Sequence, residues 1–288
     1  RQMCIRDRFN QSLIKVSAAV KDELTAKCLK NMSLFAARKA VNCNLGEIDD
    51  VRDWMINHTL PVIDLGQKMF NYAERNMLEN PDAKKHLLDF CHNIGFNIED
   101  MAVEKDYMSL TPEMIQFIKS SGQLSDENAS KLSKDPKMPN GFKTDFIVSV
   151  INKRGKEIYT LPKASQSEGT LRAMGIETAL YVAEQNNKLL PIDEIETSMH
   201  PLLLKFMIQS FLKVQSRSQL LLTTHYDPLF TAVDDYLRKD SFWLMDKRDD
   251  GHSELYPLIS KNGVNKMRSL QRAYLNNKLG ALPQIANV

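Results

Sequence analysis

The feature that most constrains this chain is the stretch from Leu189 to Pro201. Its first four residues, Leu189 to Ile192, are apolar and predict a buried strand, and Asp193 and Glu194 follow at once. A strand that ends in adjacent acids is typical of phosphoryl-transfer sites, where one carboxylate binds Mg²⁺ and another acts on water. A strand that simply ends in two solvated acids has the same pattern, so this motif alone leaves both interpretations open.

The segments on either side of this strand predict alternating helices and strands. A helix is expected from the Ser/Gly cluster that begins at Ser165 to about Asn187, a second helix from His200 to Val214, and a strand from Gln219 to Thr223. The second helix has apolar residues on one face, as helices that pack on a parallel sheet do. The series predicts an α/β fold.

Before this series, the sequence predicts helices followed by antiparallel strands. Helical spacing runs from Asn10 to Asn93, with a break at Leu60-Pro61 and a helix start at Asn80-Pro81. A strand is expected at Phe96 to Glu104, and a helix start at Thr111-Pro112. The remaining predicted elements are a hairpin of 142–151 with 157–161, a hairpin of 241–246 with 254–258, and an amphipathic helix at 264–275.

These patterns suggest a division of the chain into three parts. Residues 1–8 match no element and are interpreted as a non-native or unassignable leader. Residues 9–95 are expected to form a helical insertion or lid subdomain, and residues 96–288 the α/β core. Within the core, residues 120–140 are polar and rich in lysine and turn residues, which predicts a surface excursion.

Composition excludes few functions. The chain is 43% hydrophobic and 26% charged with a net charge of +2, which fits a globular protein and leaves a DNA partner open. Its four cysteines form no CxxC pair, so neither a zinc site nor a disulfide framework is predicted, and a reducing cytoplasm is the expected setting. No apolar run reaches the ~20 residues of a membrane helix, so no membrane partner is expected.

Three short elements carry the candidate chemistry: Ser167-Glu168-Gly169-Thr170 before a helix, Asp193-Glu194 after one strand, and Thr223-Thr224-His225 after the next. Backbone N–H groups at a helix start suit a phosphate, although Ser167 has the pattern of an ordinary helix cap as well. His225 is placed to contact the same phosphate or to serve a structural role.

In this order the elements resemble the ATP-binding-cassette (ABC) type of P-loop ATPase. The closest resemblance is to the AAA-like ATPases grouped with abortive-infection and overcoming-lysogenization (OLD-like) proteins. It runs from about Phe96 to the end of the chain. The motifs that carry it are the signature SEGTLR, the Walker B strand LLPIDEIETSMHP, the switch-histidine strand QLLLTTHYDPLF, and the C-terminal FWLMDKRDDGHSELYPL and YLNNKLGALP.

The resemblance implies a P-loop NTPase sheet with flanking helices, with ATP and Mg²⁺ as cofactors. It further implies that Asp193 coordinates Mg²⁺, that Glu194 polarises the attacking water, and that His225 senses the γ-phosphate. The signature residues would bind a nucleotide held by a second protomer, which makes a homodimer the expected assembly. The signature positions are Ser167, Glu168, Gly169 and Thr170, and the positions of the family's D-loop at the dimer interface are Ser198 and His200.

One departure from the family pattern matters more than the matches. The sequence contains no GxxxxGK[ST] loop, since Gly155-Lys156 is followed by Glu157 and has no glycine five residues before it. The expectation is therefore a chain that is incomplete at its N-terminus and lacks the first strand and the phosphate loop. The alternative is a pseudo-ATPase that contributes only a signature half-site.

The function expected from the resemblance is ATP hydrolysis by the motor or sensor component of an anti-phage or abortive-infection system. A partner nuclease or toxin effector is expected to receive the conformational change. Two alternatives remain: a non-catalytic regulatory or interaction module with the same fold, and a DNA-repair-type ABC ATPase. The second is disfavoured because such ATPases insert long heptad arms, and the excursion at 120–140 is too short and too polar to be one.

Overall fold

The computed structural model describes residues 17–27, 34–39, 45–121, 132, 136–233, 235–248 and 250–282. By its internal contacts the chain divides into two compact units, Arg1–Leu60 and Pro61–Val288. Residues 1–8, for which a leader was predicted, lie outside the described residues.

The described part of the first unit is helical, as predicted. It contains α2 (Ala18–Lys27), α3 (Leu34–Arg38) and α4 (Glu47–His58). The guanidinium of Arg38 donates two hydrogen bonds to the Asp49 carboxylate, at 2.8 and 2.9 Å, and thereby joins α3 to α4. These bonds, together with one from the Leu45 backbone, lower the pKa of Asp49 to about 2.

The second unit begins with two helices, α5 (Met69–Glu79) and α6 (Pro81–Asn93). The predicted start of α6 is confirmed: the Asn80 side chain accepts hydrogen bonds from the backbone of Asp82 at 2.9 Å and of Ala83 at 3.4 Å. Pro81 occupies the first helical position, where its missing N–H costs nothing.

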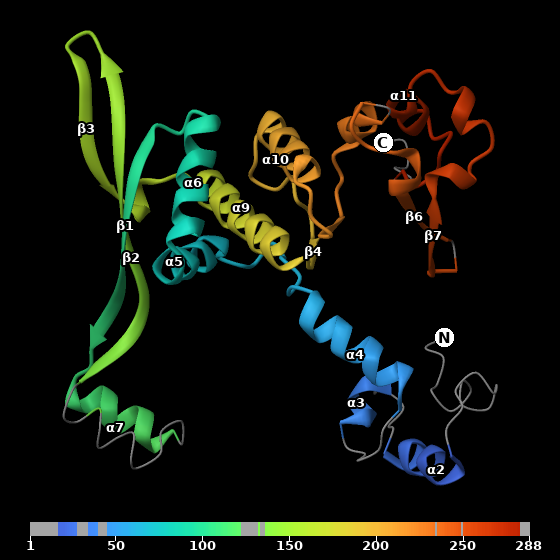
Figure 1. Ribbon diagram of the computed structural model, residues 1–288, viewed down its shortest axis with the longest axis horizontal. Helices are drawn as coiled ribbons and strands as arrows, with labels where there is room; N and C mark the ends of the chain where they lie inside the picture. The colour runs from blue at the N-terminus through green and yellow to red at the C-terminus, as the bar shows by residue number, and fades with distance from the viewer. Residues whose placement is uncertain are drawn as a thin grey trace. The chain divides into compact units, whose positions relative to one another are not determined.

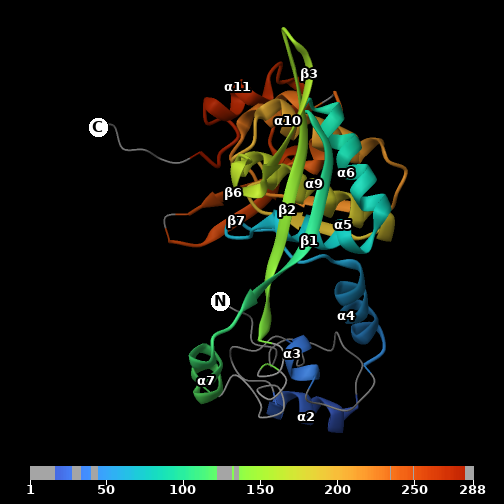
Figure 2. The same cartoon turned by 90° about the vertical axis from the view of Figure 1, so that its left-hand side faces the viewer.

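An antiparallel sheet follows, with the strand order β1-β2-β3. Its strands are β1 (Ile98–Ser109), β2 (Lys137–Asn152) and β3 (Gly155–Pro162), and α7 (Pro112–Ser120) begins at the predicted Thr111 cap. The hairpin prediction is confirmed, and Gly155 provides the positive φ of 121° at the turn. Helices α5 and α6 contact this sheet (Figures 1 and 2). The ring centroids of Phe70 on α5 and Phe146 on β2 lie 5.6 Å apart.

The last residues of the predicted surface excursion at 120–140 are exposed but form part of a strand. Lys137 to Asn140 belong to β2, where Lys137 to Pro139 pair with Tyr107 to Ser109 and Asn140 lies at a register shift. Cross-strand hydrogen bonds therefore override the polar, turn-rich composition of this stretch. Most of the remaining excursion lies outside the described residues.

The predicted αβαβ series is confirmed. It comprises α9 (Glu168–Asn186), β4 (Leu189–Ile192), α10 (Pro201–Lys213) and β5 (Gln219–Leu222), which follow the short turn η1 (Lys163–Ser165). Strands β4 and β5 are parallel, and Ile63 pairs with the other edge of β4. Helix α9 contacts α5, α6 and α10 (Figure 1), and Gly175 allows the close approach of α5, because a Cβ there would lie 2.5 Å from Met69.

The C-terminal segment builds a small core of its own around Phe230, Leu244, Leu258 and Leu279. The predicted hairpin is confirmed as β6 (Trp243–Lys247) and β7 (Ser253–Pro257). The other elements are η2 (Asp227–Ala232), η3 (Lys239–Ser241), η4 (Leu258–Ser260), η5 (Val264–Lys266) and α11 (Leu270–Leu275).

The prediction of one helix at 264–275 is wrong. The segment forms η5, breaks at Met267, and resumes as α11. The Ser269 hydroxyl accepts a hydrogen bond from the Arg272 N–H at 3.2 Å and so starts a new helix. Val264 and Leu270 are both buried in the small core, which fixes the two pieces separately.

The division at Leu60 also differs from the boundary predicted after residue 95. Helices α5 and α6 pack against α9 and β1, so their contacts belong with the second unit. Whether residues 9–95 form an inserted subdomain of the family stays a prediction.

Candidate functional site

The parallel pairing of β4 and β5 brings two of the predicted elements to one edge of the sheet. Asp193 follows β4 and Thr223 follows β5, and their strands end side by side. The Thr223 hydroxyl donates a hydrogen bond to Asp193 Oδ1, and it accepts one from the Glu194 N–H at 2.9 Å. One threonine side chain therefore holds the carboxylate of Asp193 and the backbone of Glu194.

Glu194 and His225 also meet at this edge. The Nε2 atom of His225 lies 3.7 Å from Glu194 Oε1. The histidine side chain is 86% exposed and the glutamate 34%, so the contact faces solvent and contributes little to stability by itself. Both groups are accessible to a ligand.

The chain just after β4 is held in an unusual backbone conformation. Glu194 has φ of 45° and Ser198 has φ of 61°, both in the left-handed region. For residues other than glycine this conformation costs roughly 1–2 kcal/mol each. Backbone strain of this kind clusters at functional sites, where the surrounding structure holds it. Here the Thr197 N–H donates to Glu194 O at 3.1 Å and closes the turn.

The predicted signature residues form the first turn of α9. The Ser167 hydroxyl caps the helix by accepting a hydrogen bond from the Thr170 N–H at 3.0 Å, and it lies 2.8 Å from the Thr170 hydroxyl. Glu168 is exposed in this turn. Gly169 lies against Ser198, since a Cβ at Gly169 would be only 2.3 Å from the Ser198 carbonyl oxygen. The structure therefore brings the signature turn and the Ser198 turn together.

His200 has a local role. Its Nδ1 accepts a hydrogen bond from the Leu202 N–H at 3.2 Å and so caps α10, whose first residue is Pro201. Among the described residues its ring makes no hydrogen bond to Asp193, Glu194 or His225. Its described hydrogen bond therefore serves the start of α10 and not the residues at the strand ends.

Three residues of this site were not among the predicted site residues: Thr223, Arg172 and Glu196. Arg172 is only 8% exposed, and it donates to the backbone carbonyls of Glu194 at 3.4 Å and of Asp64 at 3.5 Å. Burial lowers the pKa of its guanidinium, and the surrounding carboxylates oppose that shift. Glu196 accepts the His225 N–H at 2.6 Å. The position of Arg172 within SEGTLR, one turn after the cap, was the available signal for it.

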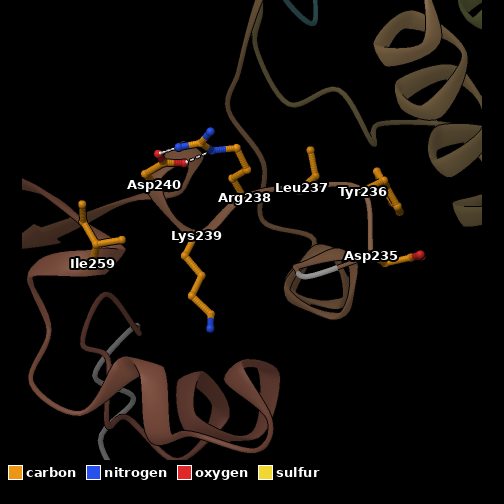
Figure 3. Close-up of a pocket in the computed structure, with 7 residues that line it drawn as sticks. All are labelled: Asp235, Tyr236, Leu237, Arg238, Lys239, Asp240 and Ile259. Atoms are coloured by element: carbon orange, nitrogen blue, oxygen red, sulfur yellow. Dashed lines mark hydrogen bonds and ion pairs between the residues drawn. The ribbon is translucent and has the colours of Figure 1, made fainter.

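Two surface hollows of the described residues are not lined by these carboxylates. The larger one, of about 610 Å³, is wide open and is lined by residues 235–240 and Ile259 (Figure 3). Arg238 and Asp240 face each other there and pair, with Nε 2.9 Å from Oδ1. None of the predicted site residues lines it. The edge that carries Asp193 and His225 is an open surface, which fits a ligand covered by a second surface better than one enclosed in a cavity.

The donor set at this edge limits how a metal ion can bind. Across the part of the chain that the structure describes, no three His, Cys, Asp or Glu side chains are close enough to hold a metal ion. Mg²⁺ commonly uses one or two carboxylates together with phosphate oxygens and water. A single carboxylate such as that of Asp193 is compatible with this mode of Mg²⁺ binding.

A family model matches residues 47–231, which is most of the chain. Its description reads "AAA domain, putative AbiEii toxin, Type IV TA system". The chain belongs to this AAA-domain family. The AAA domain implies a P-loop NTPase fold, in agreement with the parallel β4-α10-β5 unit. The matched residues include both strand ends and the signature turn.

A search among curated proteins found no match to the chain. In the described residues there is also no helix with the length and apolar character that a membrane crossing requires.

Proposed function

We propose that this chain supplies the hydrolytic part of an ABC-like ATPase site that converts ATP and water into ADP and phosphate. The observation that carries the proposal is the meeting of Asp193, Glu194 and His225 at the shared edge of two parallel strands, with Thr223 holding the Asp193 carboxylate and the Glu194 backbone. Phosphoryl transfer requires positioning and charge stabilisation in this kind of arrangement.

Each residue has a role in the proposal. Glu194 accepts a hydrogen bond from the attacking water and orients it, because its carboxylate is accessible at the strand end. His225 donates to the γ-phosphate from the next strand. Asp193 would hold the Mg²⁺ ion, which neutralises phosphate charge when it is bound.

The site is proposed to be completed by a second copy of the chain. The N–H groups of Glu168 and Gly169 precede the first hydrogen bond of α9, and they lie at the positive end of the helix dipole; both features favour phosphate. Ser167, Glu168, Gly169 and Thr170 are proposed to face the nucleotide of the partner. The packing of Gly169 against Ser198 supports this, because it places the signature turn beside the segment proposed to cross the dimer interface, which includes His200.

The phosphate-binding loop is proposed to join the sheet at β5. Among the described strands β5 pairs with β4 alone, and Leu221 on β5 is 58% exposed. Parallel sheets normally have both faces covered by helices, so the exposed Leu221 indicates that this face of β5 lacks its cover, and the β5 edge lacks a described neighbour. A further strand added at this edge would bring a phosphate loop next to Asp193 and His225.

In the cell, we place this ATPase in an abortive-infection or toxin–antitoxin system, with a toxin or nuclease as its partner. The support is the family description, which names a toxin of a Type IV system. The proposal includes a cytoplasmic location. It makes no statement on whether the ATPase binds DNA.

The decisive experiment uses the complete reading frame, including any coding sequence upstream of Arg1. The Glu194→Gln variant should retain ATP binding within about 3-fold and lose at least ~10²-fold in turnover, as loss of an acid–base group does. Glu157→Gln, on the β3 hairpin, is the matched control and should hydrolyse ATP normally. Unchanged turnover in Glu194→Gln would refute the assigned role.

A second candidate is a non-catalytic module with the same fold. The sequence observation that favours it is the lack of a GxxxxGK[ST] motif. A complete reading frame that also lacks this motif, and that neither binds nor hydrolyses ATP, would support the module over the enzyme.

A further inference from the structure

Two charged side chains beside the proposed site each have a buried polar atom without a partner. Within the described residues, Arg172 Nε and Glu196 Oε2 are both inaccessible to solvent and make no hydrogen bond. One is a donor that carries positive charge, and the other is an acceptor that carries negative charge. Unpaired buried groups of this kind are uncommon because each loses its hydrogen bonds to water without gaining a partner in the protein.

The two side chains reach the site from different elements. Arg172 lies in the second turn of α9 and holds the backbone carbonyl of Glu194 at 3.4 Å. Glu196 lies two residues beyond Glu194, and its other carboxylate oxygen accepts the backbone N–H of His225 at 2.6 Å. The arginine therefore contacts the segment of the proposed base, and the glutamate contacts the segment of the proposed phosphate sensor.

The two side chains meet the same short segment, because the carbonyl that Arg172 binds belongs to Glu194, two residues before Glu196. The Glu196 carboxylate is among the groups that raise the pKa of the Arg172 guanidinium against the effect of burial, together with Asp64, Glu168 and Glu194. A guanidinium presents its donors in a planar fork, so a small rotation changes which acceptor it meets. A backbone carbonyl is a weaker partner for it than a carboxylate.

We propose that Arg172 and Glu196 are positioning residues that couple α9 to His225. In the present arrangement Arg172 binds the Glu194 and Asp64 carbonyls. In a second arrangement Arg172 Nε–H donates to Glu196 Oε2, and the pair moves the His225 backbone with the first turns of α9. The coupling would link the signature turn to the phosphate sensor of the same chain, and in this it rests on the proposed function.

The test measures hydrogen exchange at the His225 backbone amide, without nucleotide. Glu196→Ala removes the acceptor of this amide and should speed its exchange by about 10-fold or more. Arg172→Met should speed it by roughly 3-fold, because the second arrangement, in which Arg172 holds the Glu196 carboxylate, is lost. The double variant should be no faster than Glu196→Ala, since the arginine acts through the glutamate.

Two further variants separate coupling from loss of structure. Arg172→Lys keeps the charge and should restore slower exchange at His225, whereas Gln185→Ala, exposed near the far end of α9, should leave it unchanged. Unchanged exchange at His225 in Arg172→Met overturns the proposal. So does an equal increase at buried amides throughout β2 and α9, which indicates general destabilisation. Because no nucleotide is present, these outcomes are independent of whether the chain hydrolyses ATP.

Discussion

Two charged side chains, Glu74 beside α9 and Arg172 on it, are buried, and they differ in how completely their polar atoms are hydrogen-bonded. The Glu74 carboxylate on α5 is fully buried, accepts from Lys163 Nζ at 2.8 Å on both oxygens, and also receives the Thr144 hydroxyl. Arg172 has two long bonds to carbonyls and, among the described residues, no partner for its Nε. A fully paired charge acts as a fixed support, whereas an incompletely paired one retains alternatives.

The difference matches the positions of the two groups. Lys163 lies in η1, just before the Ser167 cap, so the Glu74 pair anchors the entrance to α9 against α5 and β2. Arg172 lies inside α9, at the turn that faces Glu194. The Glu74–Lys163 pair thus holds one side of α9 in place, while the contacts of Arg172 can change. A helix that transmits a movement needs both kinds of contact.

The largest expected effect tests the support. Lys163→Met leaves the Glu74 carboxylate buried without its cation and should lower the free energy of unfolding by about 3–5 kcal/mol. The measurement is urea unfolding followed by circular dichroism. The control Lys84→Met breaks the more exposed pair with Asp100 and should cost no more than about 1 kcal/mol. Equal losses in the two variants would remove the distinction between the regions.

A double variant sharpens this result. Replacing both members, as Glu74→Leu with Lys163→Met, removes the unpaired charge and should recover part of the lost stability. No recovery would mean that the cost lies in packing around Lys163, for example against the Phe70 ring 5.5 Å away, and not in the buried charge.

The next effect concerns the contact between the signature turn and Ser198. Gly169→Ala places a methyl group against a backbone carbonyl, which cannot move aside as a side chain does, and should destabilise the chain by about 1–3 kcal/mol. Gly66→Ala is the control: its methyl group would meet Asp64 Oδ1 at 3.5 Å, an ordinary contact, so stability should change by no more than ~0.5 kcal/mol. The measurement is the midpoint temperature of thermal unfolding for both variants. Similar midpoints would show that the first turn of α9 moves away from Ser198 at little cost.

The smallest effect lies at the other end of α9. Burial, and then the nearby Glu177 carboxylate, raise the pKa of Glu184 from 4.5 to about 7. The folded chain therefore holds a proton that the unfolded chain releases, and this contribution to stability is lost as pH rises from about 4.5 to about 7. Glu184→Gln should be more stable than the native chain at pH 8, by roughly 1 kcal/mol after allowance for solvent screening, and should lose this advantage at pH 4. An advantage that does not vary with pH would contradict the assignment.

The sequence predicted most of the second unit because local signals and hydrophobic periodicity agree there. Asn80-Pro81 and Thr111-Pro112 combine a helix cap with a proline at the first position, and both helices begin where expected. The errors occurred where long-range contacts decide. Lys137 to Asn140 are polar and yet belong to β2, because β1 supplies their hydrogen bonds.

For the candidate site, the sequence identified the residue types and the family motifs, and the AAA-domain family is confirmed for residues 47–231. The roles of the individual residues stay predictions. Arg172 and Glu196 were missed because a charged residue in a helix or a turn is usually exposed. The motif SEGTLR pointed to Arg172, but no local pattern signals that Arg172 is buried or that Glu196 is half-buried.

The sequence by itself determined the alternation of helices and strands, the acids at the end of β4 and the histidine after β5. These follow from short-range periodicity and from side-chain chemistry at fixed positions. Only the tertiary structure decided that Thr223 joins the two strand ends, that Gly169 lies against Ser198, and that one charged group beside α9 is fully paired while another is not. The reason is that hydrogen-bond satisfaction depends on residues far apart in the chain, which a linear pattern does not record.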